Sequence, residues 1–191
     1  MATFSDRALS IQPTDVRKMF DLAGDDVISF GLGEPDFQPP DIAIEAFYQA
    51  MKDGHNKYTT TAGLPALRQQ IAESWNNYQD GLNSDNVCIT MSGTNAILNL
   101  FLTFVNPGDN VLIPEPYFPL YGPDAKLCGG EANYYPCLFE DEFVPLVEKL
   151  EKLVNEKTVA ILYNFPGNPT GGTLNVEQRD ALLDFAKRHD L

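Results

Sequence analysis

The chain has 191 residues, of which 43% are hydrophobic and 21% charged, and its formal net charge at pH 7 is −14. This composition is that of a globular protein and argues against a disordered chain. The negative charge argues against nucleic acid and anionic membrane as partners, since both require a clustered positive surface. No signal peptide and no apolar stretch long enough to cross a bilayer is evident, so we expect a cytoplasmic protein. The three cysteines share no short metal-ligand spacing, and we expect no metal site.

Prolines and glycines divide the chain near residue 40. Residues 1–40 are punctuated by them and carry only a weak helical pattern, over residues 15–22, which predicts an arm and a shaped loop. From residue 41 onward the pattern becomes regular. We expect one amphipathic helix from Asp41 to a glycine stop at Gly54, and a second helix that begins at Pro65.

Beyond these helices the sequence alternates between strands and helices. We expect strands at residues 86–91, 110–114 and 158–163, and helices at residues 95–104, 122–127, 145–155 and 176–189. Asn175 and Gln178 can form a capping box for the last helix. Cys88, in the first expected strand, is interpreted as a small core residue. This alternation predicts an α/β domain whose largely parallel sheet is covered by helices on both faces.

Ser92, Gly93 and Thr94 join the first expected strand to the start of a helix. The N-terminus of a helix offers unpaired N–H groups and the positive end of a dipole, and Gly93 allows close approach of a ligand. The hydroxyl groups of Ser92 and Thr94 add donors, so the turn could hold a phosphate. A plain helix cap made of the same residues is the alternative.

Two further segments follow the carboxyl ends of expected strands, which is where ligands bind in open α/β sheets. The segment Tyr163–Gly172 contains Asn168, whose amide can donate to an anionic oxygen; the alternative is a turn rich in Asn, Pro and Gly. The segment Glu115–Tyr121 carries three aromatic side chains between prolines. They could form a rigid wall for a flat ring, or they could pack the edge of the domain.

Five segments, in this order and at these separations, resemble the class I/II aminotransferases that depend on pyridoxal 5′-phosphate (PLP), the fold-type I or aspartate aminotransferase superfamily. These segments are Gly33–Phe37, Tyr58–Arg68, Ser92–Thr94, Pro116–Tyr121 and Asn168–Gly171. The resemblance implies the three-layer α/β/α large domain of that family, with a mostly parallel sheet. Residues 41–191 would be the PLP-binding domain, and residues 1–40 the N-terminal arm and substrate loop.

The resemblance also assigns the cofactor-binding residues. Ser92–Thr94 matches the family's phosphate-binding turn, and Phe118 matches the aromatic residue that stacks on the pyridine ring. Asn168 matches the residue that hydrogen-bonds the cofactor's phenolic oxygen. Tyr58 matches a tyrosine that reaches the cofactor phosphate of the neighbouring subunit, so a homodimer is implied. Gly33 matches a glycine beside the substrate carboxylate, and the implied substrates are an amino acid and a 2-oxo acid.

The lysine that forms the Schiff base in this family comes well after the segment that matches Asn168–Gly171. No residue of this chain matches it, so we expect an incomplete large domain, no catalytic lysine and an inactive chain. The lysines present are Lys18, Lys52, Lys57, Lys126, Lys149, Lys152, Lys157 and Lys187. Two alternatives to an aminotransferase stay open: another fold-type I enzyme, such as a β-lyase or a synthase, and a non-catalytic fragment or split subunit.

We predict that the 191-residue chain forms no stoichiometric covalent adduct with PLP. Each lysine is expected on a polar helix face, in a loop or in the arm, and none in an apolar pocket that would activate its amine. Borohydride reduction in the presence of PLP, followed by mass spectrometry of the peptides, measures the adduct. Site-specific pyridoxyllysine at one equivalent, together with amino transfer by this chain alone, would contradict the prediction.

Overall fold

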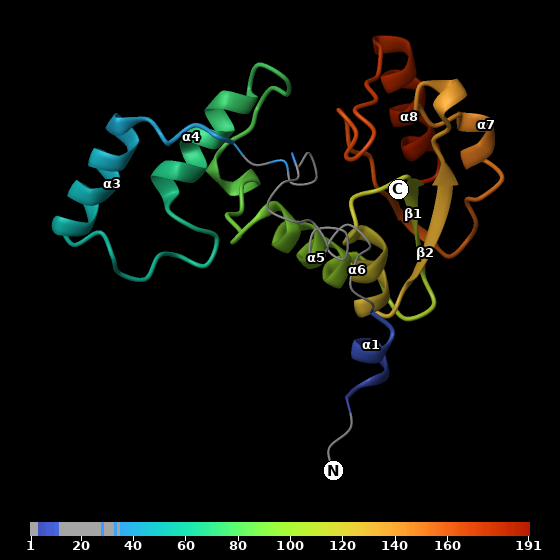
Figure 1. Cartoon of the computed structure of the whole chain (residues 1–191), viewed down its shortest axis with the longest axis horizontal. Helices are drawn as coiled ribbons and strands as arrows, with labels where there is room; N and C mark the ends of the chain where they lie inside the picture. Colours follow the sequence, from blue (N-terminus) through green and yellow to red (C-terminus); the bar gives the residue numbers. More distant parts are fainter. Residues whose placement is uncertain (1–3, 12–27, 29–32, 34) are drawn as a thin grey trace. The chain divides into compact units, whose positions relative to one another are not determined.

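The computed structural model describes residues 4–11, 28, 33 and 35–191 (Figure 1). The helix expected at residues 15–22 lies outside the described residues. The chain divides into two compact units: residues 1–14 with residues 92–191, and residues 15–91. Each unit has its own local architecture. The first carries the β-sheet.

The sheet of the first unit contains three strands, β1 (Asn110–Glu115), β2 (Glu131–Pro136) and β3 (Thr158–Ile161). Their order is β2-β1-β3, and β1 pairs in parallel with both neighbours. Because β1 is central, Val111, Leu112 and Ile113 are each 0% exposed. A run of branched apolar residues is typical of a parallel strand that is buried on both faces.

A polar network fixes the amino end of the sheet, where β1 and β3 begin. The Thr158 hydroxyl donates to the Asn110 side-chain oxygen at 2.9 Å, and the Asn110 amide donates to Asn155 Oδ1 at 3.2 Å. The Asn155 N–H donates to the Thr158 hydroxyl at 3.0 Å. Asn110 and Thr158 are buried, and their mutual hydrogen bonds offset the loss of water.

One face of the sheet is covered by α5 (Gly93–Phe104) and α6 (Tyr121–Leu127). Phe101 and Val105, from α5 and its C-cap, pack with Tyr121 and Ala125 of α6 on Val111 and Ile113 of β1. These two strand residues point to the same side because successive strand side chains alternate. The short helix α1 (Asp6–Leu9) adds one contact to this layer, since Arg7 donates to the Leu127 carbonyl at 3.4 Å.

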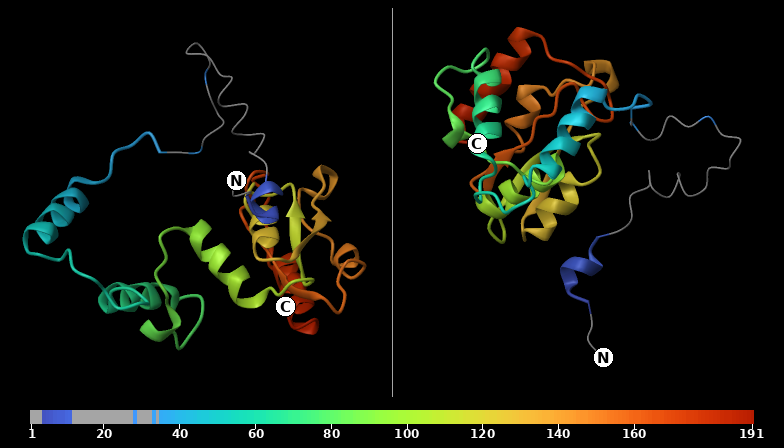
Figure 2. Two further views of the ribbon diagram at one scale, coloured as in Figure 1. Left: turned by 90° about the horizontal axis from the view of Figure 1, so that it is seen from below. Right: turned by 90° about the vertical axis from the view of Figure 1, so that its left-hand side faces the viewer.

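The opposite face is covered by α7 (Val147–Leu150) and α8 (Val176–Arg188) (Figure 1, Figure 2). Leu150, Leu182 and Phe185 pack there with Leu112 of β1 and Tyr135 of β2. The expected capping box of α8 is present, with Asn175 and Gln178 bonded reciprocally at 2.8 and 2.9 Å. The prediction of an α/β fold with three layers and a parallel sheet is confirmed for the described residues.

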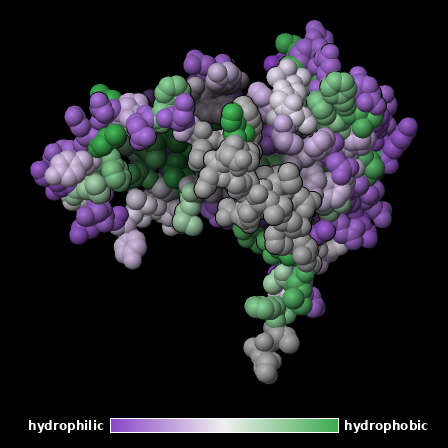
Figure 3. All heavy atoms as spheres, viewed as in Figure 1, coloured by the Kyte–Doolittle hydropathy of each residue, from purple (hydrophilic) through white to green (hydrophobic). Residues whose placement is uncertain are grey.

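The second unit contains α3 (Asp41–Lys52), α4 (Pro65–Trp75) and the 3₁₀ turn η1 (Ser84–Asn86). Arg68 of α4 donates to the Val87 carbonyl at 2.8 Å and holds the following segment against the helix. Gly63 has a φ of +102°, and a Cβ there would meet Ile89, so glycine is required for this turn. The apolar side chains of α3 and α4 remain largely exposed, and Figure 3 shows hydrophobic residues at the surface of this unit.

Three expectations about local structure are wrong. The strand expected at residues 86–91 is an extended segment whose Ile89 N–H bonds the Ala62 carbonyl at 2.9 Å, outside any sheet of the described residues. Cys88 in this segment is therefore exposed. The helix expected at residues 145–155 is the single turn α7, and β2 was not expected at all.

No helix in the part of the chain that the structure describes is long and apolar enough to span a membrane.

Asp124 of α6 is an unusual residue in this layer. Its side chain is only 6% exposed, and its Oδ2 atom has no hydrogen-bond partner among the described residues. Burial raises the pKa of this carboxyl group above its ordinary value, because desolvation disfavours the charged form. A group whose pKa is raised by folding favours the folded state most below its unfolded pKa. That contribution is lost as the pH rises through the folded-state pKa.

We therefore predict that Asp124→Asn becomes more stable than the unmodified chain as the pH rises from 4 to 7. The expected gain in the free energy of unfolding at pH 7 is about 1 kcal/mol, the usual scale for one buried unsatisfied polar group. Urea unfolding should be followed by circular dichroism, because the single tryptophan, Trp75, lies in the other unit. The exposed Glu148→Gln is the matched control, and an equal pH response of both variants would contradict the prediction.

Candidate functional site

Both helices on the first face of the sheet run toward its amino end. The turn Asn106–Asp109 joins α5 to β1, and there the Gly108 N–H donates to the Gly129 carbonyl, just after α6, at 3.3 Å. The C-terminal ends of α5 and α6 therefore meet at the amino end of the sheet. Their N-termini point to the carboxyl end, where the loop after β3 also begins. The topology brings three segments singled out in the sequence to this one edge of the sheet.

Ser92 is the N-cap of α5, and its hydroxyl accepts a hydrogen bond from the Asn95 N–H at 3.1 Å. The first N–H groups of a helix have no acceptor within the helix. The first turn of α5 contains no acidic residue, and a Cβ built at Gly93 would meet nothing within 4 Å. This helix start is capped, open to solvent and suited to an anion. Both interpretations of Ser92–Thr94 thus find support in one geometry.

The aromatic segment after β1 is held by contacts with its neighbours. Phe118 is half-buried and its ring lies 5.5 Å from that of Tyr121, tilted by 56°. The Tyr117 ring stacks on Tyr134 of β2 at 5.1 Å, and their hydroxyl groups lie 3.2 Å apart. Burial, and secondly the hydrogen bond with Tyr117, raise the pKa of Tyr134. The Tyr134 hydroxyl therefore stays protonated at neutral pH, and the segment is a packed wall at the sheet edge.

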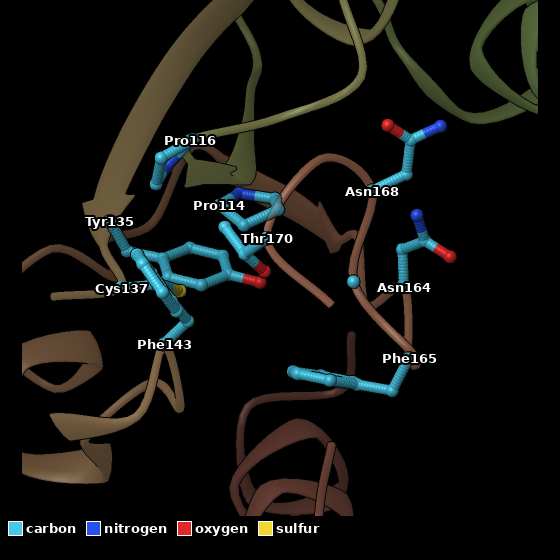
Figure 4. Close-up of a pocket in the computed structure, with 10 residues that line it drawn as sticks. Pro114, Pro116, Tyr135, Cys137, Phe143, Asn164, Phe165, Asn168 and Thr170 are labelled. Atoms are coloured by element: carbon cyan, nitrogen blue, oxygen red, sulfur yellow. The ribbon is translucent and has the colours of Figure 1, made fainter. Parts of the chain in front are cut away.

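The loop after β3 presents two amide side chains. Figure 4 shows Asn164 and Asn168 leaving the loop on the side away from Tyr135 and Phe143, while Thr170 lies on the same side as those rings. The amide of Asn168 is exposed and has no hydrogen-bond partner among the described residues. No motif of the sequence assigns a role to Asn164. Its only signal is its position, four residues before Asn168 on the same loop.

A narrow pocket lies beside this loop, and Asn164 and Asn168 are among the residues that line it. Its lining includes Pro114, Tyr135, Phe143 and Thr170 (Figure 4). The Tyr135 hydroxyl donates to the Leu162 carbonyl at 2.7 Å, and burial raises its pKa. The Tyr135 hydroxyl in this lining is thus already satisfied, and the ring supports the loop instead of offering a donor to a ligand.

Gly33 and Tyr58 belong to the other unit. Gly33 is exposed, and a Cβ built on it would meet nothing within 4 Å. The Tyr58 side chain is fully exposed and makes no contact with another described residue. The roles expected for these two residues stay predictions, as do those of Ser92–Thr94, Phe118 and Asn168.

The family model for aminotransferase class I and II matches residues 25–191. The matched stretch includes the helix start at Ser92, the aromatic segment around Phe118 and the loop that carries Asn168. The chain therefore belongs to the class I and II aminotransferase family.

Individual relatives lie at moderate identity. The chain is 38% identical over 192 residues to the aromatic-amino-acid aminotransferase 2 of Thermococcus litoralis, and 39% identical over 192 residues to the aspartate aminotransferase of Pyrococcus abyssi. Each alignment covers 98% of this chain and 49% of the relative. The aspartate aminotransferase of Thermus thermophilus with maleate superposes with a TM-score of 0.93 at 31% identity, covering 100% of this chain and 52% of that one. The chain spans about half the length of the curated relatives it matches.

Enzymes of this family use PLP. PLP consists of a phosphate group, a flat pyridine ring and a phenolic oxygen, and the sheet edge offers a matching donor set. The N-terminus of α5 can bind an anion, Phe118 supplies an aromatic ring, and the amide of Asn168 can donate to an oxygen. The residues present therefore fit this cofactor.

We predict that Ser92→Asp separates the capping role from the anion-binding role. Aspartate is an equally good N-cap, so this variant should keep the stability of the unmodified chain, whereas Ser92→Ala should lose about 1 kcal/mol. Inorganic phosphate should raise the urea unfolding midpoint of the unmodified chain but not that of Ser92→Asp, because the new carboxylate repels the anion. Asn175→Asp, the same change at the N-cap of α8, is the control. Equal stabilisation of Ser92→Asp by phosphate would contradict the assignment.

Proposed function

We propose that this chain carries the cofactor-binding half of a PLP-dependent aminotransferase, which transfers an amino group from an amino acid to a 2-oxo acid. One observation carries the proposal: an uncrowded helix N-terminus and an unpartnered amide, Asn168, both belong to the carboxyl edge of one parallel sheet. Ligands of open α/β sheets bind at this edge. The names of the relatives favour transamination over a β-lyase or synthase reaction.

In this proposal the phosphate binds at the N-terminus of α5, to the N–H groups and hydroxyls of Ser92, Gly93 and Thr94. Phe118 stacks on the pyridine ring. Its packing against Tyr121 holds the aromatic ring in place before the cofactor arrives, so little side-chain freedom is lost on binding.

Asn168 donates to the phenolic oxygen of the cofactor and so fixes the ring in its plane. An amide is suited to this contact because it donates without adding a charge beside the phosphate. When bound, PLP supplies an electron sink for the bond changes at the amino acid's Cα. The protein's part is to bind and orient: Gly33 would leave room for the substrate carboxylate, since nothing occupies the space beside its Cα.

The proposed enzyme would be a cytoplasmic homodimer. The complete exposure of the Tyr58 ring supports this proposal, because a tyrosine that reaches the phosphate of a neighbouring subunit cannot pack within its own chain. In the proposed division of the chain, residues 1–40 form the arm and substrate loop and residues 41–191 belong to the large domain. The substrates of individual relatives, aspartate or aromatic amino acids by their names, define the class from which the amino donor would come.

We predict that the chain binds PLP without a covalent bond and that Asn168→Ala weakens this binding about tenfold. That ratio corresponds to the loss of one hydrogen bond to a charged oxygen. Titration followed by the absorbance and fluorescence of PLP measures the dissociation constant. The exposed Asn77→Ala is the matched control and should bind like the unmodified chain. Equal affinity of Asn168→Ala and the unmodified chain, or no competition by inorganic phosphate, would refute the proposed site.

A further inference from the structure

The loop that carries Asn168 is closed by its own hydrogen bonds. The Gly167 N–H donates to the Gly172 carbonyl at 2.8 Å, and the Gly171 N–H donates to the Gly167 carbonyl at 2.7 Å. The Thr170 hydroxyl accepts from the Gly172 N–H at 3.3 Å. Thr170 is the only residue of this ring of bonds that contributes a side chain. Its hydroxyl also lies against Gly167, where a Cβ would come within 2.5 Å of it.

The closed loop rests on a second segment of the same unit, the connector Leu138–Val144 between β2 and α7. A Cβ built at Gly172 would lie 3.1 Å from both the Glu142 carbonyl oxygen and the Phe143 Cβ. Such distances are tighter than ordinary van der Waals contact, so the backbone at Gly172 approaches the connector as closely as a glycine allows. The loop backbone at Gly172 therefore cannot move toward the connector unless the connector moves as well.

The connector itself is firmly held in a costly conformation. Glu142 and Phe143 both adopt left-handed backbone angles, with φ of 55° and 60°, which non-glycine residues rarely do. The Phe143 N–H donates to the Leu138 carbonyl at 2.8 Å, and Asp141 pairs with Lys149 of α7 at 3.0 Å. This hydrogen bond and this ion pair stabilise the left-handed backbone at Glu142 and Phe143. The connector is a rigid support, and Phe143 is its point of contact with the loop.

We propose that Thr170, in the loop that rests on this support through Gly172, is a positioning residue that sets the direction of the Asn168 amide. Thr170 lies on the side of the loop that faces Tyr135 and Phe143, and Asn168 lies on the other side (Figure 4). Thr170 would therefore act on Asn168 through the loop backbone and not by direct contact. The hydroxyl of Thr170 fixes the loop backbone from within. The amide of Asn168, which has no partner among the described residues, depends on that backbone for its orientation. The catalytic consequence of this inference rests on the proposed function, whereas the orientation itself belongs to the chain alone.

The test compares Thr170→Val, which removes the hydroxyl at nearly constant shape, with Thr170→Ser, which retains it. Thr103→Val is the matched control, since the Thr103 hydroxyl donates to the Asn99 carbonyl at 2.7 Å on α5. Two readouts need no cofactor: hydrogen exchange of the Gly171 and Gly172 amides, and the side-chain amide resonances of Asn168 in a nitrogen-15 labelled chain. The third readout is the dissociation constant of PLP. It is measured for Thr170→Val, for Thr170→Ser, for Asn168→Ala, and for the double variant that combines Thr170→Val with Asn168→Ala.

In Thr170→Val, exchange at Gly172 should be about fivefold faster and PLP binding about fivefold weaker, the ratio for one ordinary hydrogen bond. The Asn168 resonances should shift, and Thr170→Ser should restore all three readouts. In the Asn168→Ala background Thr170→Val should cause no further loss, because the two residues act through one contact. Additive losses, or unchanged Asn168 resonances in Thr170→Val, would overturn the positioning role. Shifted resonances in a chain that binds no PLP would refute the proposed function and leave the positioning role standing.

Discussion

The complete burial of β1 on both faces is the constraint from which the rest of the sheet unit follows. Val111 and Ile113 require α5 and α6 on one side, and Leu112 requires α7 and α8 on the other. A parallel strand cannot be joined to its neighbours by a tight turn, so every connection must cross the sheet through one of these layers. The need to cover one strand twice therefore determines where each helix begins and ends.

The same constraint explains why polar groups collect at one edge. Helices that cover a parallel sheet run against the direction of its strands, so their capped starts appear beside the strand ends. At the amino edge the polar side chains are hydrogen-bonded to one another, as in the network of Asn110, Asn155 and Thr158. At the carboxyl edge the Asn168 amide has no hydrogen-bond partner among the described residues. The amino edge thus stabilises the sheet, and the carboxyl edge is where we propose that the cofactor binds.

Local signals in the sequence predicted most of the helices, because the information lies within a few residues. Pro65 starts α4, and Asn175 and Gln178 cap α8, as their patterns indicate. The errors arise where tertiary contacts decide. The expected strand at residues 86–91 bonds Ala62 instead of a sheet, and β2 becomes a strand because β1 offers it a complete set of partners. The helix expected at residues 145–155 is one helical turn followed by tighter turns, in which the N–H groups of Leu153 and Val154 both donate to the Leu150 carbonyl. For the site, the sequence indicated Asn168, but the contact of Gly172 with Phe143 joins segments that no local pattern connects.

Two glycines determine how closely α6 and the residues just after it pack on their neighbours. A side chain at Gly122, in its first turn, would collide with the Tyr134 hydroxyl, and one at Gly130, beyond its last turn, would collide with Val105. Because neither glycine carries a side chain, the start of α6 can pack against Tyr134 of β2, and the residues just after α6 can pack against Val105 at the end of α5. Even an alanine at Gly122 would force either the Tyr134 ring or α6 to move, and the Tyr134 ring is stacked on Tyr117 in the aromatic segment that leads into α6.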